Sequence, residues 1–185
     1  MTILYFVRHA HSVYNSNELR RPLSNKGAMD SISVCELLKN ERVDHIISSP
    51  YRRAVETVET LSIYLKKEIV IEESLRERTL SEEPVEDFNY AVEQVWKNVH
   101  FSWEGGESNI QAQLRGVQAI LHILNKYEGE RVVVSTHGNI MVLMMNYFDS
   151  TYGFDFWKQL DMPDIYKLTF EGEKMTDVEH IWTRQ

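Results

Sequence analysis

Short apolar runs rich in β-branched residues recur along this chain, and each is followed by polar residues. Four such runs occupy residues 3–7, 43–47, 69–71 and 132–134. Continuous runs of this length are typical of strands that are covered on both faces of a parallel sheet. The chain is therefore expected to form an α/β fold around a buried sheet.

Helical patterns separate these runs. Ser24 is expected to cap a helix that reaches Lys39, and further helices are expected over residues 52–66, 108–127 and 140–147. In the segment 108–127, apolar residues recur at steps of three and four, which predicts one buried helix face. The residues of this face are Leu114, Val117, Ile120, Leu121 and Leu124. Strands that alternate with helices predict a three-layer α/β/α sandwich with a mostly parallel central sheet.

Residues 79–106 interrupt this alternation and are interpreted as an insertion or lid over the active site. Acidic residues come first in the segment and aromatic residues follow: Phe88, Tyr90, Trp96, Phe101 and Trp103. These aromatic side chains either pack in the core or line a cleft. Because there is no repeat and no Gly/Ser linker, residues 1–185 are expected to form a single domain, with a last hairpin or edge strand in residues 165–182.

Charge and cysteine content limit the partners of the chain. The 185 residues include 20 basic and 28 acidic side chains, a net charge of −8, which argues against nucleic-acid binding but allows a local pocket for a small anion. The single Cys35 cannot form an internal disulfide. No signal-peptide pattern and no long apolar span is present, so we expect a cytoplasmic protein without a membrane partner.

Polar residues follow each of the four predicted strands, and ligands collect at the carboxyl ends of strands in open α/β sheets. Arginine offers a planar fork for phosphate oxygens, and a helix start, with Ser48 or Ser49 as its cap, favours an anion. Gly138 would let the backbone approach a ligand closely. In chain order the clusters are Arg8-His9, Ser48-Ser49 with Arg52-Arg53, Glu77, and His137-Gly138.

Histidines, arginines and a glutamate at one edge suit phosphoryl transfer. Guanidinium groups and a protonated histidine can neutralise the equatorial oxygens, so neither a metal nor another cofactor is required. One neutral imidazole would attack phosphorus and form a phosphohistidine. A carboxylic acid would protonate the departing alkoxide and then deprotonate water, which predicts a bell-shaped pH profile on a small phosphorylated substrate.

The same residues resemble the motifs of the histidine phosphatase superfamily, which includes cofactor-dependent phosphoglycerate mutase. Its signature Arg-His-Gly-x-Ser/Thr-x-x-x-Asn is approached by residues 8–15. Five further matches follow in family order: Pro22-Leu23-Ser24-Asn25-Lys26-Gly27, Ser48-Ser49-Pro50-Tyr51-Arg52-Arg53-Ala54, Leu75-Arg76-Glu77, Gly105-Gly106-Glu107-Ser108 and Ser135-Thr136-His137-Gly138. The resemblance covers most of the chain and implies a phosphoglycerate mutase-like fold.

The resemblance also implies a role for each matching residue. His9 would be the nucleophile and Glu77 the proton donor. The transferred phosphoryl group would be bound by Arg8, Arg53 and His137. Arg53 is preferred to Arg52 because the family's arginine directly precedes an alanine, here Ala54. The substrate would be contacted by Asn15, Ser12, Arg21 and Gly138.

Three departures from the family pattern bear on rate and substrate choice. Ala10 replaces the usual glycine, where a methyl group would crowd the backbone if the residue needed a positive φ. His11 stands where Glu or Gln is common. After Glu77, residues 78–82 replace the Gly-Trp-Glu-Gly-like stretch of many relatives.

A phosphomonoester hydrolase of the histidine acid phosphatase type is favoured over a mutase, because the glycolytic mutases are longer and carry an extra closing segment. A phosphoester-binding pseudoenzyme and a metal-dependent hydrolase using His9 and His11 are the alternatives, although Arg8 would repel a divalent ion. A cysteine phosphatase is disfavoured because six residues, not five, separate Cys35 from Arg42. If the aromatic residues after position 88 line the cleft, the substrate should have an apolar or planar body. The physiological ester and the oligomeric state are left open.

Overall fold

The four apolar runs form the parallel part of one six-stranded sheet in the computed structural model, which describes residues 1–183. The strand order is β3-β2-β4-β1-β5-β6, and β5 and β6 form an antiparallel hairpin beside β1. The strands are β1 (Thr2–Arg8), β2 (His45–Ser48), β3 (Ile69–Ile71), β4 (Arg131–Thr136), β5 (Asp164–Glu171) and β6 (Lys174–His180). The predicted mostly parallel sheet and its closing hairpin are confirmed.

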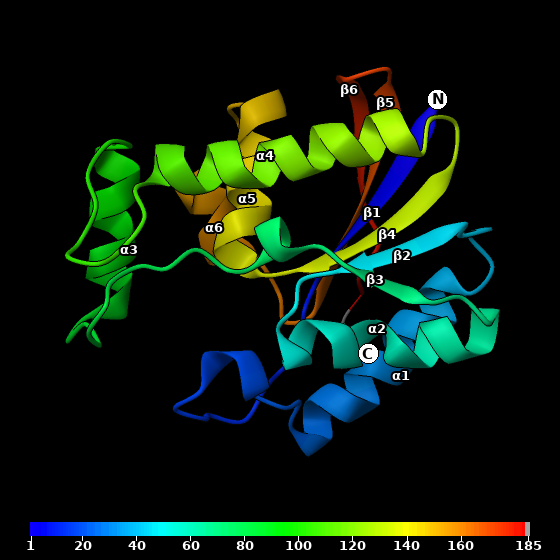
Figure 1. Cartoon of the computed structure of the whole chain (residues 1–185), viewed down its shortest axis with the longest axis horizontal. Coiled ribbons are helices and arrows are strands. Elements are labelled where there is room, and N and C mark those ends of the chain that lie inside the picture. The colour runs from blue at the N-terminus through cyan, green and yellow to red at the C-terminus, as the bar shows by residue number, and fades with distance from the viewer. Residues whose placement is uncertain (184–185) are drawn as a thin grey trace.

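Helices cover both faces of the sheet (Figure 1). Alternate residues of β1 point to opposite faces: Leu4 and Phe6 belong to the core under α4 and α5, whereas Tyr5 and Val7 belong to the core under α1 and α2. The helices are α1 (Asn25–Leu38), α2 (Arg52–Leu65), α3 (Phe88–Lys97), α4 (Asn109–Lys126), α5 (Gly138–Phe148) and α6 (Phe154–Gln159), with short 3-10 turns η1 (Glu18–Arg20) and η2 (Glu73–Leu75). The three-layer α/β/α architecture is therefore confirmed.

Local capping explains where two of these helices begin. Ser24 accepts a hydrogen bond from the Gly27 amide at 3.1 Å, as predicted, and Ser108 forms a reciprocal capping box with Gln111. The predicted serine cap of α2 is wrong, because Tyr51 occupies that position and provides no side-chain cap. Leu114 is also not part of the buried face of α4; it is 50% exposed, because the buried stripe is centred on the opposite side of the helix.

Parallel pairing brings the ends of three strands to one edge of the sheet. Arg8 at the end of β1 is in register with Thr136 of β4, and Ser48 of β2 is in register with Ser135. The next residues continue the pairing, since the His9 amide donates to the Thr136 carbonyl at 3.0 Å. Residues that follow these strands are consequently held close together.

Residues 79–106 leave the sheet and return to it. The Glu107 amide donates to the Thr79 carbonyl at 2.7 Å, and the Glu82 amide donates to the Glu104 carbonyl at 2.9 Å, so the two ends of the segment lie side by side. Between them, α3 lies at one end of the molecule, away from the sheet (Figure 1). Among the described helices, none has the length and apolar character needed to span a membrane.

Candidate active site

His9 lies directly after β1 and is buried, with 7% of its surface exposed. Its Nδ1 is 2.7 Å from the Ala10 carbonyl oxygen, which can only accept, so Nδ1 carries the proton. Its Nε2 therefore keeps a lone pair, toward which Arg53 Nε donates at 3.3 Å. Burial and, next, the charge of Arg53 lower the pKa of His9 to about 3, so the imidazole is neutral near pH 7.

His137 follows β4 and is the N-cap residue of α5. It is fully buried, its ring centroid is 5.1 Å from that of His9, and its Nε2 is 2.7 Å from Ser49 Oγ. Burial is the main cause that holds the pKa of His137 well below its usual value, and the neighbouring His9 and arginines act in the same direction. Two neutral imidazoles thus lie edge to face at the end of the sheet.

Two arginines flank these histidines. Arg8 Nη1 donates to the Leu160 and Asp161 carbonyls, at 3.3 and 3.0 Å, and Arg53 Nη1 donates to the Glu18 carbonyl at 2.9 Å. Burial lowers the pKa of both guanidinium groups, without making either neutral near pH 7. They place fixed positive charge beside His9.

Gly138 and Arg52 explain which groups face the site. A Cβ atom at Gly138 would lie 2.9 Å from Arg8 Nε, so the glycine permits the close approach of a side chain to the backbone. Arg52 pairs with Glu56 instead, at 2.6 Å, and its side chain is 57% exposed. Of the two neighbouring arginines, Arg53 is the one that points to the histidines.

Glu77 reaches the same edge from the segment after η2. Its carboxylate accepts hydrogen bonds from the amides of Asn139 at 3.1 Å, Ile140 at 3.0 Å and Arg78 at 2.8 Å. The first two are free amides at the start of α5, so Glu77 takes the place of a side-chain cap there. This ties the glutamate to the helix that begins beside His137.

Two adjoining cavities open over these groups. One, of about 270 Å³, is lined by His9, His11, Ser12, Arg21, Arg53 and Met162. The other, of about 360 Å³, includes Glu77, Arg21, Arg53, Tyr51, Arg78 and Phe88 in its lining. Among the described residues, four buried nitrogens at this edge have no hydrogen-bond partner: Arg8 Nε, Arg21 Nε, Arg78 Nε and His137 Nδ1. Buried polar atoms are seldom left unpaired, so these atoms indicate a site for a hydrogen-bonding ligand.

The remaining predicted substrate contacts are placed unevenly. Arg21 borders both cavities and donates to Ser12 Oγ at 3.0 Å. Asn15 instead accepts from the Asn17 amide at 2.8 Å within its own loop, and it is not among the residues that line either cavity. The structure brings Ser12 and Arg21 to the site and leaves Asn15 outside it.

The departures from the family signature are accommodated without backbone strain. Ala10 is not among the described residues with a positive φ, and its amide donates to Thr57 Oγ1 at 2.9 Å. His11 is exposed at the rim of the smaller cavity, where its Nδ1 lies 2.8 Å from Ser24 Oγ. The methyl group of Ala10 therefore does not disturb the loop that carries His9.

Sequence patterns did not reveal two contacts of the site. Glu18 Oε2 is 3.1 Å from Arg53 Nη2, and Ser49 bonds His137. Ser49 was expected after its strand as a cap of α2, and not as a partner of His137. Glu18 begins the short 3-10 turn η1 and does not follow a strand, so the sequence offers no such signal and the contact depends on tertiary folding.

Some aromatic residues of the 79–106 segment pack inside the protein, and others line a cleft. Trp103 donates from Nε1 to the Ala91 carbonyl at 3.0 Å, and Trp96 packs against the core, so the suggestion that these tryptophans line the cleft is wrong. Phe88 lines the cavity that contains Glu77, and Phe88 and Tyr90 also line a neighbouring cleft that includes Arg8. Within residues 1–183, no group of three or more His, Cys, Asp or Glu side chains could hold a metal ion.

Comparisons with known proteins agree with this geometry. The family model of the histidine phosphatase superfamily (branch 1) matches residues 4–182. A Hydrogenobacter thermophilus protein with the provisional name phosphoserine phosphatase 2 is 25% identical, over 95% of this chain and 93% of its own. Phosphoglycerate mutase-like protein 4 of Arabidopsis thaliana is 30% identical, over 73% of this chain and 66% of its own. The structure of Entamoeba histolytica phosphoserine phosphatase in complex with 3-phosphoglyceric acid superposes with a TM-score of 0.78 at 19% identity, covering 100% of this chain and 98% of the other.

Proposed function

Because the chain belongs to the histidine phosphatase superfamily, we propose that it hydrolyses phosphomonoesters through a covalent phosphohistidine at His9. The observation that carries this proposal is the state of that imidazole. His9 is buried and neutral, its proton is fixed on Nδ1, and the lone pair of its Nε2 faces Arg53 Nε at 3.3 Å. A nucleophile needs this lone pair, and an incoming phosphate needs the adjacent positive charge.

The proposed reaction has two steps. Nε2 of His9 attacks phosphorus, the bond to the ester oxygen breaks, and the carboxylic acid of Glu77 protonates the departing alkoxide. Glu77, now a carboxylate, then removes a proton from water as that water attacks the phosphohistidine. The P–N bond breaks, inorganic phosphate leaves, and His9 is again neutral. Arg8, Arg53 and His137 hold the phosphoryl group, whose oxygens would pair the free Arg8 Nε and His137 Nδ1.

His9→Ala tests the nucleophile. We expect phosphate release from 4-nitrophenyl phosphate, measured with excess chelator, to fall by about 10³-fold or more, because the variant lacks the Nε2 that attacks phosphorus. His122→Ala, which removes an exposed histidine of α4, is the matched control and should retain wild-type activity. Acid-labile labelling of the wild type by a ³²P ester, absent from His9→Ala, identifies the intermediate. Equal activity of wild type and His9→Ala would overturn the proposal.

Glu77→Gln tests the proton donor separately. A general acid matters most when the leaving group is a strong base, so we expect kcat/KM for ethyl phosphate, which reports the first step alone, to fall by about 10²- to 10⁴-fold. The kcat/KM for 4-nitrophenyl phosphate, whose leaving group needs little protonation, should fall much less. A uniform loss of kcat/KM on both esters would assign Glu77 only to the start of α5, where it already bonds the Asn139 and Ile140 amides.

A further inference from the structure

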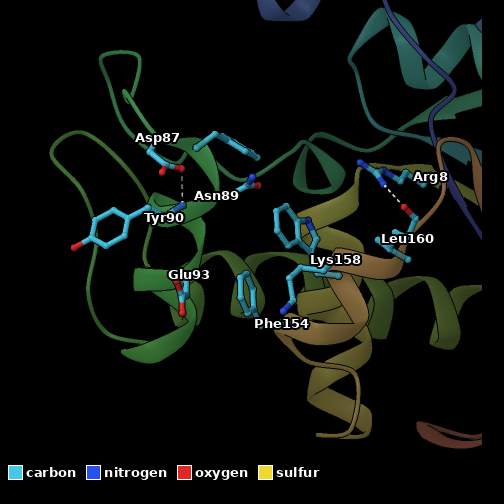
Figure 2. Close-up of a pocket in the computed structure, with 10 residues that line it drawn as sticks. Arg8, Asp87, Asn89, Tyr90, Glu93, Phe154, Lys158 and Leu160 are labelled. Carbon is cyan, nitrogen blue, oxygen red and sulfur yellow. Dashed lines mark hydrogen bonds between the residues drawn. The ribbon is translucent and has the colours of Figure 1, made fainter.

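A cleft of about 810 Å³ lies between α3 and α6, next to the candidate active site. Figure 2 shows Arg8 and Leu160 at one end, α3 with Asn89 and Glu93 at the other, and Phe154 and Lys158 along the side between them. Its volume is within the range of about 300–1,000 Å³ that small-molecule sites have. The cleft is larger than either of the two cavities that border the catalytic groups.

Aromatic rings form the apolar part of this cleft and contact one another. The Trp157 ring stacks on Phe154 at 5.7 Å between centroids, and its centroid is 6.2 Å from that of Phe88. The Lys158 ammonium lies 4.8 Å from the Phe154 ring centroid. None of these three rings belongs to the core clusters of the described residues, and Phe88 is 51% exposed. Phe154 and Trp157 are partly exposed as well, so part of each ring remains accessible to a ligand.

The cleft is connected to the catalytic groups through two shared residues. Arg8, which flanks the histidines, also lines the cleft. Phe88 lines the cleft as well as the cavity that contains Glu77 and Arg53. An ester whose phosphoryl group is at His9 would place its alcohol on the Glu77 side, and a long alcohol would extend from there past Phe88.

We propose that Phe88, Phe154 and Trp157 form a subsite for the alcohol part of the substrate, and that the enzyme prefers phosphomonoesters with a flat aromatic body to small aliphatic ones. The proposal rests on the proposed function, since it assigns the substrate class of the same active site. Ring stacking favours a planar group, and the neighbouring Lys158 ammonium would attract the face of an electron-rich ring.

The kinetic test compares benzyl phosphate with ethyl phosphate, because both release a primary alcohol and differ mainly in the ring. Wild type should show a kcat/KM about tenfold higher for the benzyl ester, as expected for one added ring contact. Trp157→Ala and, from the opposite wall, Phe88→Ala should reduce this ratio severalfold, chiefly through KM. Tyr64→Ala is the matched control: this exposed ring of α2 also has a lysine over it, Lys39 at 5.8 Å, and its loss should leave the ratio unchanged.

A binding test distinguishes failure of the subsite from failure of the proposed function. Benzylphosphonate and methylphosphonate cannot be hydrolysed, so calorimetry measures their affinities whether or not the protein is active. We expect benzylphosphonate to bind wild type about tenfold more tightly and this advantage to shrink in Trp157→Ala. Equal affinity of the two phosphonates for wild type would overturn the subsite, even if both esters were hydrolysed through His9. Selective benzylphosphonate binding without any hydrolysis would support the subsite and count against the proposed function alone.

Discussion

At the residue scale, Glu18 places a negative charge where the substrate phosphate needs positive charge. Its carboxylate is 3.1 Å from Arg53 Nη2 and 3.1 Å from Arg21 Nη1. A bound phosphate would compete with this carboxylate for the same guanidinium groups. Glu18 therefore holds the arginines in place in the free protein and lowers their net attraction for an anion.

Glu18→Gln should bind inorganic phosphate more tightly than wild type, by about three- to tenfold, because the amide keeps the shape of the side chain and removes its charge. Competitive inhibition by phosphate measures this affinity. Glu59→Gln, which neutralises an exposed carboxylate of α2, is the control and should leave the inhibition constant unchanged. Weaker phosphate binding by Glu18→Gln would mean that the carboxylate is needed to orient Arg53.

At the element scale, the segment that carries Glu77 has little regular structure and depends on Arg115 of α4. Arg115 donates to the Ser74 carbonyl at 2.7 Å and the Arg76 carbonyl at 3.0 Å, and it forms a two-pronged ion pair with Glu107 at 2.8 and 2.9 Å. Burial by itself raises the pKa of Glu107, but hydrogen bonds from Arg115 and the Thr79 amide outweigh it and the pKa is lowered. Arg115 is thus a positioning residue for Glu77.

Arg115→Met should lower the free energy of unfolding by about 2 kcal/mol, because it removes the hydrogen bonds to two carbonyls and the two-pronged ion pair of a partly buried carboxylate. Urea unfolding measures this loss. Displacement of Glu77 should also reduce kcat/KM for ethyl phosphate more than for 4-nitrophenyl phosphate, an asymmetry that lower stability alone does not produce. Lys97→Met, which breaks an exposed ion pair with Glu93, should change neither quantity.

Helices and strands with strong local signals could be predicted from the sequence, whereas those fixed by tertiary contacts could not. α1 and α4 begin at serine caps that the sequence displays, and the apolar runs match β1 to β4 closely. α6 has six residues and no side-chain cap, and it was not predicted. A cleft lined by the aromatic residues after position 88 was considered, but its second wall was missed, since Phe88 meets Trp157 from a distant part of the chain.

At the scale of the whole molecule, the sheet concentrates positive charge at one edge of a chain whose net charge is −8. The order of motifs after the strands predicted which residues come together, because parallel strands present their ends on one side. The order of motifs could not predict the hydrogen-bond partners of each side chain, such as the Ala10 carbonyl that accepts from His9 or the Leu160 carbonyl that accepts from Arg8. Those contacts depend on loop conformations that no periodicity encodes.

Burying His9 and His137 as neutral imidazoles should make the stability of the whole chain depend on pH. Both have a pKa below the unfolded value of about 6.5, so acid protonates these side chains in the unfolded chain before it protonates them in the folded one. Their contribution to stability is therefore fully present above about pH 6.5 and is lost as the pH falls toward the folded values, which for His9 is about 3.

Each such histidine adds a slope of about 1.4 kcal/mol per pH unit to the free energy of unfolding within this window. Removing one of them in His9→Ala should reduce the slope between pH 6 and pH 4 by that amount, while carboxylates contribute equally to both proteins. Urea unfolding at pH 6, 5 and 4 gives the two slopes. Parallel lines would mean that His9 binds its proton equally well in the folded and unfolded chain, and the neutral nucleophile on which the proposed chemistry depends would then be lost below neutral pH.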